Sequence, residues 1–358
     1  MKVCQSLAQV GHEVRLWAPG HQSTPWDELS GRYGLNTPFE ITWLPCNPAL
    51  KRYDLAAKAV HQAQQWKAGI IYTWLPQAAV LGQRRALPIV LEVHDRPTGR
   101  LGPWLLRRAV TMAGRKRIAV ITRALATVLR QEFNLAIPEE VLVIAPNGAD
   151  LERFEHLPDA PSARAQLGLP PDRLTAVYSG HLYPGRGIDL VLRLAQAFPQ
   201  VGFLIVGGNP EAVESYCRQA ADTGLGNVTL TGFVENQRLP LYQAAGDILL
   251  MPYGRVIAGS SGGNSADICS PMKLFEYLAT GRAILTSDLP VFREVLNERN
   301  AVFCQAEGFE SWQAGLQELI NHPEKRQALA QKARLDARRY AWTARSKAIL
   351  DHFEQERK

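Results

Sequence analysis

The chain has 358 residues, which exceeds the usual size of one domain, so two domains are expected. Its 40 basic and 34 acidic residues give a net charge of +6, which suits anionic small molecules or a membrane surface but is too diffuse to indicate nucleic acid. Five scattered cysteines without a CxxC pair exclude a cysteine-based zinc site and fit a reducing compartment. No apolar run approaches the roughly 18 residues of a membrane span, and the N-terminus lacks a signal-peptide pattern, so we expect a cytoplasmic protein.

The beginning of the chain predicts an α/β domain that lacks its opening strand. Residues 1–10 are typical of the end of a helix, and residues 13–19, EVRLWAP, are typical of a strand. A doubly wound domain normally begins with a strand in the middle of its sheet. We therefore expect a slot between two inner strands, with unpaired backbone groups on both sides. Either the true start lies upstream of Met1 or the domain is impaired, and the residues leave both alternatives open.

Strands and helices alternate through the rest of the first half. Residues 21–36 are polar and without a period, which predicts a loop. In chain order we expect a strand at 41–44, a helix at 53–66, a strand at 70–72, a helix at 78–85, a strand at 89–93, a strand at 118–122, a helix at 124–132 and a strand at 141–145.

His94 directly follows the β-branched strand at 89–93. Ligands of open α/β sheets bind at the carboxyl ends of strands, so His94 is a candidate catalytic residue. The alternative is an ordinary polar side chain whose hydrogen bonds are satisfied within the protein.

Residues 100–123 combine basic and apolar side chains and contain no acidic residue. A basic helix that bears an aromatic residue such as Trp104 can lie on an anionic membrane surface, and a solvated helix face is the alternative. The basic residues are Arg100, Arg107, Arg108, Arg115, Lys116, Arg117 and Arg123.

The proline-rich residues 155–173 predict a linker, and we place the domain boundary within it. The N-terminal domain is expected to span residues 1–160 and the C-terminal domain residues 161–338. The final helix, at 339–358, is treated as a separate element that runs through Trp342.

The second half repeats the α/β rhythm. We expect strands at 174–179, 203–206, 228–230, 248–251 and 302–304, and helices at 188–198, 211–223 and 239–245, with a short helix after Pro290 and two helices at the end. Residues 254–265 are rich in glycine and serine, which predicts a mobile loop that can close over a substrate.

The segment GHLYPGRG, residues 180–187, joins a predicted strand to a predicted helix. Glycines and Arg186 at a helix N-terminus predict an anion cradle, because backbone N–H groups then point at the anion's oxygens. A purely structural turn is the alternative. The segment matches neither GxGxxG nor the GK[ST] of a P-loop, so neither a nicotinamide enzyme nor a P-loop ATPase is indicated.

Residues 270–288, SPMKLFEYLATGRAILTSD, predict a helix followed by a buried strand at 283–286. Ser270 is expected to cap the helix, Pro271 suits its first turn, and Gly281 is expected to end it after Thr280.

Two charged side chains of this helix are unusual for their positions. Glu276 falls on the apolar stripe, where a carboxylate without a partner costs free energy. Lys273 lies near the helix start, where its charge opposes the dipole unless an anion is bound there. A ligand with phosphates for Lys273 and hydroxyls for Glu276 would satisfy both. Alternatively, a neighbouring backbone group or Arg282 satisfies Glu276.

Together these segments resemble the family 4 glycosyltransferases, which are retaining enzymes with two facing Rossmann-like domains, the GT-B fold. The resemblance covers essentially the whole chain, and it implies that the final helix, 339–358, crosses back to the N-terminal domain. Its two specific segments are YSGHLYPGRGIDLVL and SPMKLFEYLATGRAILTSDLP, and two weaker ones are GHEVRLWAP and APNGADLERF.

The resemblance implies a role for each matching position. Arg186 and Lys273 are expected to contact the donor diphosphate and His94 to line the reaction centre; these three are the candidate catalytic residues. Glu276 is expected to hold the donor ribose hydroxyls. The amides of Met272, Lys273 and Leu274 are expected to help bind the phosphate, and Gly232 and Phe233 to frame the base. The full set of candidate donor-binding residues is Gly180, His181, Gly207, Gly232, Phe233, Asp267, Pro271, Met272, Leu274 and Glu276.

The sequence departs from the family pattern at two places. Many members carry a second carboxylate where this chain has Ile268, with Asp267 adjacent. The first strand and its glycine-rich turn, which in relatives approach the donor phosphates and the acceptor, are also absent.

The resemblance implies transfer of a hexose, with retention, from a nucleotide-diphosphate sugar to a hydroxyl of a glycan, lipid-linked or small-molecule acceptor. Cell-surface glycan or glycolipid biosynthesis is the expected setting, in the cytoplasm or peripherally on the inner membrane face. No cofactor and no metal are expected, because two fixed cations can substitute for one, and no nucleic acid is expected as a partner. The alternatives are an impaired GT-B scaffold that binds a nucleotide or partner without turnover, and a nucleotide-sugar 2-epimerase of the same fold.

Overall fold

The computed structural model describes residues 1–257 and 264–355, and the chain divides into two compact units. Unit 1 comprises Met1–Ser30, Leu35–Pro146 and Trp342–Lys358, and unit 2 comprises Gly31–Gly34 and Asn147–Ala341. All strands pair in parallel, and helices separate successive strands in both units, which confirms the predicted α/β class. Of the predicted mobile loop at 254–265, residues 258–263 lie outside the described residues.

The strands of unit 1 form two separate sheets. One has the order β1-β2 and the other the order β3-β4-β5-β6. The strands are β1 (Arg15–Pro19), β2 (Glu40–Leu44), β3 (Ile71–Thr73), β4 (Ile89–Val93), β5 (Lys116–Val120) and β6 (Leu142–Ile144).

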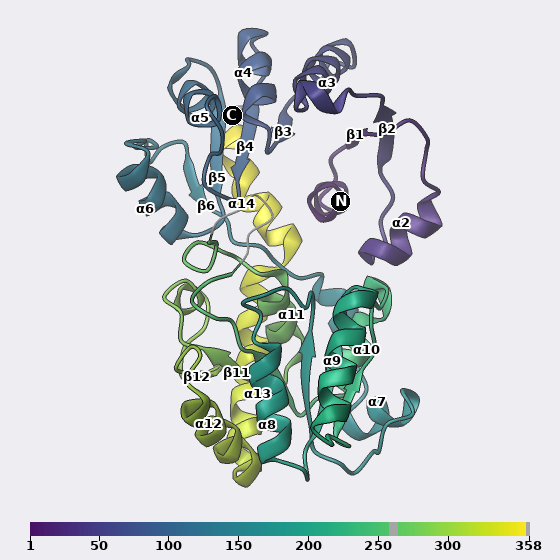
Figure 1. Cartoon of the computed structure of the whole chain (residues 1–358). Coiled ribbons are helices and arrows are strands. Elements are labelled where there is room, and N and C mark those ends of the chain that lie inside the picture. Colours follow the sequence, from purple (N-terminus) through teal and green to yellow (C-terminus); the bar gives the residue numbers. More distant parts are fainter. Residues whose placement is uncertain (258–263, 356–358) are drawn as a thin grey trace. The chain divides into compact units, whose positions relative to one another are not determined.

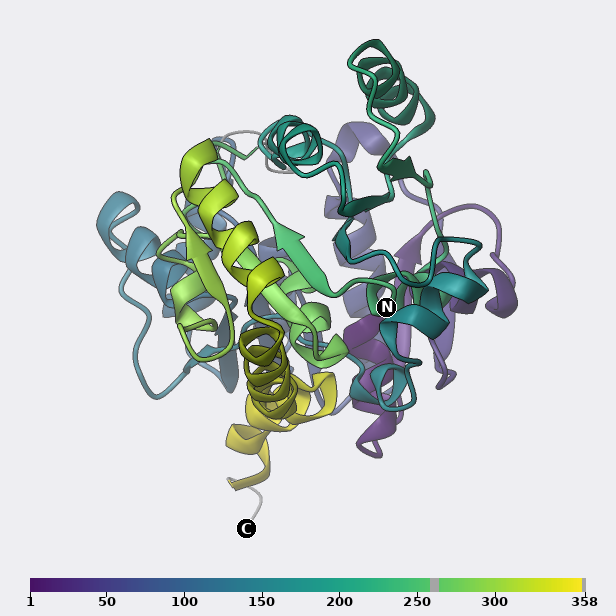
Figure 2. The ribbon, with the colours of Figure 1, turned by 90° about the horizontal axis from the view of Figure 1, so that it is seen from below.

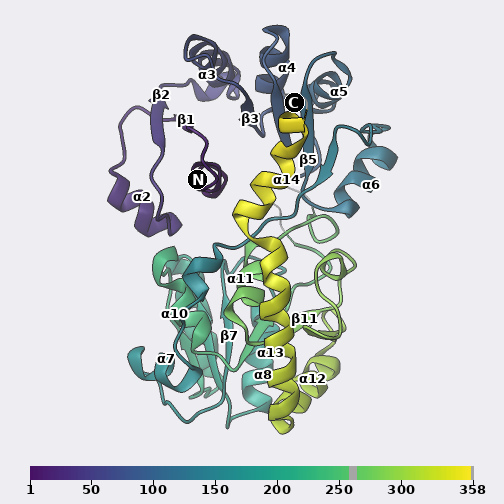
Figure 3. The ribbon, with the colours of Figure 1, turned by 180° about the vertical axis from the view of Figure 1, so that it is seen from behind.

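Helices cover both faces of the larger sheet of unit 1. The first helix and the last pack together on one face, where Leu7, Ile349 and Phe353 join Val90 and Ala119 of the sheet in one apolar cluster. Figure 3 shows α14, in yellow, running beside β5. The helices of this half and the returning helix are α1 (Lys2–Gln9), α2 (Trp26–Tyr33), η1 (Pro48–Leu50), α3 (Tyr53–Gln65), α4 (Pro76–Arg84), α5 (Gly102–Thr111), α6 (Arg123–Glu132) and α14 (Trp342–Gln355).

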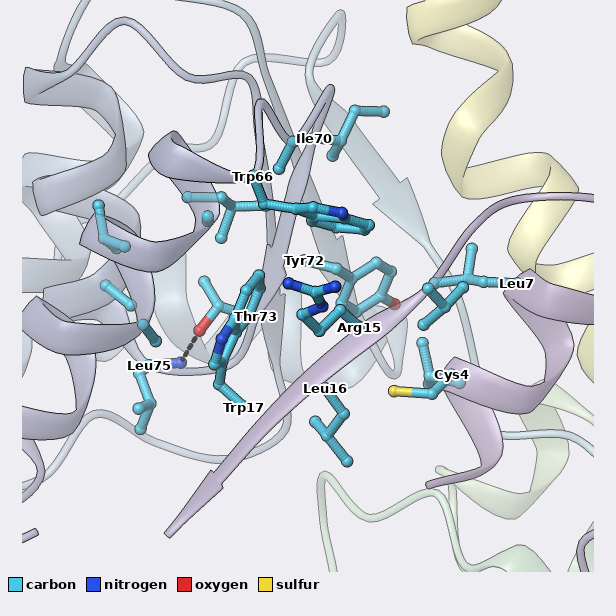
Figure 4. A pocket seen from close by; sticks show the side chains of 18 of the residues that line it. Cys4, Leu7, Arg15, Leu16, Trp17, Trp66, Ile70, Tyr72, Thr73 and Leu75 are labelled. Carbon is cyan, nitrogen blue, oxygen red and sulfur yellow. Dashed lines mark hydrogen bonds between the residues drawn. The ribbon is translucent and has the colours of Figure 1, made fainter. Parts of the chain in front are cut away.

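The interruption between the two sheets of unit 1 falls where the sequence predicts a slot. In the described part of the chain, β1 pairs with β2 alone and β3 pairs with β4 alone, so each strand keeps one open edge. A cavity of about 750 Å³ lies between these edges. Figure 4 shows Arg15 and Trp17 of β1, Tyr72 of β3, and Trp66 around it. The cavity therefore exposes backbone hydrogen-bonding groups and apolar side chains together, as a site for a further strand would.

We predict that an added strand can fill this cavity. Five apolar β-branched residues joined to Met1 by a Gly-Gly turn should pair with β1 and β3, because the short tether gives the strand an effective concentration of about millimolar. Hydrogen exchange should show slower exchange of the β1 and β3 amides. The melting temperature should rise by about 2–4 °C for each kcal/mol gained. The control carries proline at the middle of the added segment, which removes a ladder hydrogen bond. Equal protection in both proteins would contradict the prediction.

Unit 2 contains one six-stranded sheet with the order β12-β11-β10-β7-β8-β9. Its strands are β7 (Thr175–Ser179), β8 (Gly202–Val206), β9 (Val228–Leu230), β10 (Ile248–Met251), β11 (Ala283–Ser287) and β12 (Val302–Cys304). The central strands β7, β10 and β11 are buried along their whole length, as expected for a parallel sheet covered on both faces.

The helices of unit 2 lie on both faces of this sheet (Figures 1 and 2). Helices α8 and α12 contact each other on one face, and α10, α11 and α13 form a contact chain on the other. The helices are η2 (Leu151–Phe154), α7 (Ala160–Gln166), α8 (Ile188–Ala197), α9 (Pro210–Asp222), η3 (Asn236–Arg238), α10 (Leu239–Ala244), α11 (Met272–Thr280), η4 (Phe292–Glu294), α12 (Phe309–Asn321), α13 (Pro323–Ala337) and η5 (Arg338–Tyr340).

Two segments that the sequence predicts to be irregular contain helices. Helix α2 lies within the predicted loop at 21–36; acidic residues in its first turn favour the helix, and its Leu29 is buried. Helix α7 lies within the predicted linker at 155–173, where the Asp159 carboxylate accepts a hydrogen bond from the Ser162 amide at 2.8 Å. Pro161 occupies the first turn of α7, so this proline starts a helix rather than marking a linker.

Two further predictions about helices need correction. The basic helix predicted within residues 100–123 is confined to α5, which ends at Thr111, because β5 begins at Lys116 and overlaps the strand predicted at 118–122. Several of the basic side chains in this range donate hydrogen bonds to backbone carbonyl oxygens. Arg107 donates to the Phe133 carbonyl, and Arg117 donates to the Glu140 carbonyl. After β12 there are three α-helices, α12, α13 and α14, where two were expected, because His322 and the proline that follows divide one predicted helix.

Within the described residues, no helix is long and apolar enough to cross a membrane.

Candidate active site

The loop between β7 and α8 is held against the chain that follows β10. A Cβ atom on Gly185 would lie 2.0 Å from the Val256 carbonyl oxygen, and one on Gly187 would lie 1.9 Å from the Pro252 carbonyl oxygen. Both glycines have positive φ, at 82° and 76°. Only glycine allows this approach of two backbones, and it fixes the position of Arg186 between them.

Arg186 and Lys273 come from separate segments and meet at Tyr253. The Arg186 Cζ atom lies 4.5 Å from the centre of the Tyr253 ring, and the Lys273 Nζ atom lies 5.1 Å from it. Lys273 also lies over the Tyr178 ring, at 3.7 Å. Lys273 Nζ and Arg186 Nε are both buried and have no hydrogen-bond partner among the described residues. The structure thus brings together the two basic side chains that the sequence singles out, one from a loop and one from the start of a helix.

The electrostatics show an excess of positive charge at this place. Burial and then the neighbouring Arg186 charge hold the pKa of Lys273 well below its usual range, against the opposing effect of Glu276. Burial, Arg186 and Lys273 also lower the pKa of His181. Each shift means that the charged form is disfavoured in the free protein. A bound anion would remove this penalty.

Helix α11 begins beside these cations. The amides of Met272 and Lys273 occupy its first two positions and have no acceptor within the helix. The Leu274 amide instead donates to the Pro271 carbonyl at 3.1 Å, so it is used in the first turn rather than left for a phosphate. The helix ends at Gly281, whose φ of 65° confirms the predicted glycine cap.

Ser270 does not cap α11 as the sequence predicts. Its Oγ atom accepts a hydrogen bond from the Asn147 amide at 3.0 Å, and its carbonyl accepts one from Asn147 Nδ2 at 2.6 Å. The N-cap position is Pro271, which has no side-chain hydrogen bond to offer. The start of α11 therefore keeps its amides for another acceptor.

Glu276 is buried and held by an amide side chain. Its Oε2 atom accepts a hydrogen bond from Gln243 Nε2 at 3.0 Å, and Gln243 also donates to Ser179 Oγ and accepts from Thr280 Oγ1, each at 3.1 Å. Arg282 instead donates to backbone carbonyls, among them that of Gly246 at 3.1 Å, so it is not the partner that the sequence suggested. The carboxylate is therefore held in one orientation on the buried side of α11.

The remaining donor-binding candidates lie around the carboxyl edge of the same sheet. A Cβ atom on Gly180 would lie 2.9 Å from Lys273 Nζ, so glycine makes room for the cation. The Gly207 amide donates to the Gly232 carbonyl at 2.8 Å, which places the two predicted glycine turns side by side. The His181 ring stacks on Tyr183, with 4.8 Å between ring centres.

Three donor-binding candidates, and Ile268 beside one of them, differ in their exposure. Phe233 and Met272 are exposed, at 71% and 36% of their surface, and can reach a ligand. Ile268 is fully buried, whereas Asp267 beside it is exposed. The position where the resemblance implies a second carboxylate is thus an apolar core position in this chain.

Sequence reasoning missed the groups that hold these side chains. The rings of Tyr178 and Tyr253 make cation–π contacts with Lys273. Gln243 orients Glu276 by a hydrogen bond, and Asn147 donates hydrogen bonds to Ser270. Tyr253 follows the end of β10 just before the glycine-rich loop, and this position could have indicated a place in the site. No local sequence pattern indicates Gln243 or Asn147, because their partners lie 33 and 123 residues away.

His94 lies in unit 1, directly after β4. Its side chain is 47% exposed, and its Nε2 atom lies 2.6 Å from Glu92 Oε1. The ring centre lies 6.3 Å from that of Trp74. An exposed imidazole with one nitrogen engaged can still offer the other nitrogen to a ligand.

In the described part of the chain, no three His, Cys, Asp or Glu side chains are grouped so that they could hold a metal ion. The expectation that no metal is needed stays a prediction.

Comparison with known proteins places the chain in a class and then in a family. Residues 159–336 match the family described as glycosyl transferases group 1, and residues 1–153 match Glycosyltransferase Family 4. The two α/β units and these matches define a glycosyltransferase of the GT-B fold. The chain belongs to glycosyltransferase family 4.

Individual relatives agree with this placement. A phosphatidyl-myo-inositol mannosyltransferase of Mycolicibacterium smegmatis is 25% identical over 370 residues, which cover 99% of this chain and 88% of the relative. A GDP-mannose-dependent alpha-(1-6)-phosphatidylinositol monomannoside mannosyltransferase of the same organism is 31% identical over 67% of this chain and 64% of its own length.

Solved structures share the fold. Sucrose-phosphate synthase from Thermosynechococcus elongatus aligns with a TM-score of 0.75 and 17% identity, over 99% of this chain and 92% of the other. Anabaena HepE, solved in complex with UDP, aligns with a TM-score of 0.74 and 18% identity, over 99% of this chain and 96% of the other.

We predict that diphosphate binding is coupled to proton uptake by Lys273. The pKa of Lys273 is depressed in the free protein, and a bound anion should raise it. Affinity for UDP should therefore fall as pH rises through the depressed pKa. Calorimetry in two buffers of different ionisation enthalpy would measure the uptake as a difference between wild type and Lys273→Met, which cancels the titration of UDP itself. The control is Lys325→Met, at an exposed ion pair with Glu318. Identical uptake by wild type and Lys273→Met would refute the coupling.

Proposed function

We propose that the protein moves a hexose from a nucleotide-diphosphate sugar to an acceptor hydroxyl, with retention at the anomeric carbon. One observation carries the proposal: Arg186 and Lys273 converge on Tyr253 beside the start of α11, with buried nitrogen atoms that lack a partner among the described residues. A diphosphate brings both negative charge and hydrogen-bond acceptors to this place. It would satisfy both cations at once.

The same groups fit the charge that develops in the reaction. The bond between the anomeric carbon and the diphosphate breaks, and negative charge grows on the leaving phosphate oxygens. Arg186, Lys273 and the amides of Met272 and Lys273 would stabilise that charge where it forms, and such electrostatic stabilisation usually contributes more to enzymatic catalysis than any other single effect. We propose that these fixed charges act without a metal and that no covalent glycosyl-enzyme intermediate forms.

The neighbouring residues would hold the rest of the donor. Glu276 is fixed by Gln243, so its carboxylate is ready to accept hydrogen bonds from ribose hydroxyls. Gly232 and the exposed Phe233 would frame the base. His94 would orient a hydroxyl of the donor sugar or of the acceptor.

The relatives favour an acceptor attached to a lipid or a glycan. Two of them are named as phosphatidylinositol mannosyltransferases, and a third, from Streptococcus pneumoniae, as an alpha-galactosylglucosyldiacylglycerol synthase. We therefore propose a role in glycolipid or cell-surface glycan biosynthesis. In unit 1, Leu101 and Trp104 of the α5 region are about half exposed, beside the exposed Arg107 and Arg108. These side chains are the contact we propose with an anionic membrane surface.

A second candidate function is a scaffold that binds a nucleotide without turnover. The open cavity between β1 and β3 favours it, because a domain with an interrupted sheet can lose the precision that catalysis needs. Thermal-shift titration with UDP, GDP and their sugars, followed by product detection, separates the candidates. A shift without product favours the scaffold, and free UDP with an altered sugar indicates a 2-epimerase.

The mechanism predicts the effect of removing each cation. Arg186→Ala or Lys273→Ala should lower kcat by about 100-fold or more, as for the loss of one transition-state hydrogen-bond donor. Glu276→Ala should chiefly raise KM for the donor. Initial rates with the nucleotide sugar that the titration identifies provide the measurement. Arg218→Ala, at an ion pair exposed to solvent on both sides, serves as the control and should keep full turnover. Near-normal turnover of both Arg186→Ala and Lys273→Ala would contradict the proposed mechanism.

A further inference from the structure

We propose that Glu92 is a positioning residue for His94. Its carboxylate fixes the neutral imidazole as the tautomer protonated on Nε2, so that Nδ1 is offered as a hydrogen-bond acceptor to a hydroxyl. This inference rests on the proposed function, because it assigns His94 the part of receiving a hydrogen bond from the donor sugar or the acceptor.

The geometry along β4 brings the two side chains together. Glu92 and His94 are two residues apart, so they leave the strand on the same side. His94 Nε2 lies 2.6 Å from Glu92 Oε1. The Glu92 side chain is 1% exposed, whereas the His94 side chain is 47% exposed. The carboxylate is therefore the buried, fixed partner, and the imidazole is the partner that reaches solvent.

An ionised carboxylate determines which nitrogen carries the proton. A carboxylate only accepts hydrogen bonds, so the nitrogen that faces it must be the donor. In a neutral imidazole the other nitrogen is then an acceptor. Glu92 is held ionised: burial raises its pKa, but the hydrogen bond from His94 and the charge of Arg345 outweigh burial and bring it to about 2.

Two further side chains hold Glu92 itself. Arg345 of α14 donates from Nη2 to Glu92 Oε1 at 2.5 Å, and its own side chain is only 4% exposed. The Tyr72 hydroxyl of β3 donates to Glu92 Oε2. Arg345 also donates to the Pro146 carbonyl at 2.8 Å, which fixes the guanidinium against the end of the strand region. Both carboxylate oxygens are thus engaged, and the carboxylate cannot turn away from His94.

Helix α14 does more than pack against the sheet, because its Arg345 also holds the Glu92 carboxylate. Arg345 pairs with the Glu92 carboxylate, so the carboxylate has a permanently charged partner besides the imidazole. A neutral His94 with Nδ1 free is a hydrogen-bond acceptor, and an imidazolium is not. Helix α14 therefore helps to orient His94, more than 250 positions earlier in the chain, through the buried ion pair between Arg345 and Glu92.

The test reads the tautomer of His94 directly. Full-length protein labelled with ¹⁵N-histidine should give a His94 pattern with a protonated Nε2 and an unprotonated Nδ1, assigned by the difference from His94→Gln. Glu92→Gln should mix the tautomers, because an amide can donate as well as accept. It should also lower kcat/KM by about 10- to 100-fold, the loss found for carboxylates that orient metal-binding histidines.

A matched pair provides the control. His322 Nδ1 lies 2.9 Å from Glu324 Oε1 at the same spacing of two residues, but both side chains are exposed. Glu324→Gln should leave the His94 signals and turnover unchanged. If Glu92→Gln loses its cooperative melting transition, Tyr72→Phe removes one hydrogen bond to the same carboxylate and should shift the tautomers in the same direction.

The outcomes separate this inference from the proposed function. A His94 tautomer that is the same in wild type, Glu92→Gln and Tyr72→Phe overturns the positioning role, whatever the turnover. A tautomer that changes while turnover of Glu92→Gln and His94→Gln stays normal supports the positioning role. That result would instead overturn the part of His94 in sugar transfer.

Discussion

Two basic side chains held close together in a poorly solvated place are the constraint on which unit 2 depends. Arg186 and Lys273 share the Tyr253 ring, and burial and mutual repulsion disfavour the charged form of Lys273. Repulsion of this kind persists only because the surrounding structure fixes both side chains. Gly185 and Gly187 allow the loop that contains Arg186 to pack closely against the chain after β10, and α11 carries Lys273. This local architecture fixes both side chains in advance, as the proposed anion site requires.

In unit 1 the buried charges are paired with opposite charges, whereas in unit 2 two basic side chains lie together. Glu92 and Arg345 form a buried ion pair, and Tyr72 and the end of the sheet supply the remaining hydrogen bonds. A buried pair contributes little stability by itself, but removing one partner leaves an uncompensated charge. The pair therefore specifies where α14 docks within unit 1 more than it strengthens the unit. Its satisfied charges also leave His94 as the exposed polar group at the end of β4.

Unit 1 has two strand edges that face a cavity. Among the described residues β1 pairs only with β2 and β3 only with β4, and their open edges lie around a cavity of about 750 Å³, where backbone groups lack a strand partner. The strands of unit 2, by contrast, form one six-stranded sheet. In unit 1, α1 and α14 pack together against one face of the larger sheet.

The sequence by itself determined the α/β class, most strands, the loop that carries Arg186 and the helix that carries Lys273, because these depend on local periodicity, glycines and strand ends. It failed at α2 and α7, where polar composition and prolines concealed two short helices. Only the tertiary structure decided which partners hold the charged groups. Gln243 rather than Arg282 binds Glu276, and Arg345 reaches Glu92 from the other end of the chain. The reason is physical: hydrogen bonds between residues far apart in sequence depend on how strands and helices pack, and no local pattern records that packing.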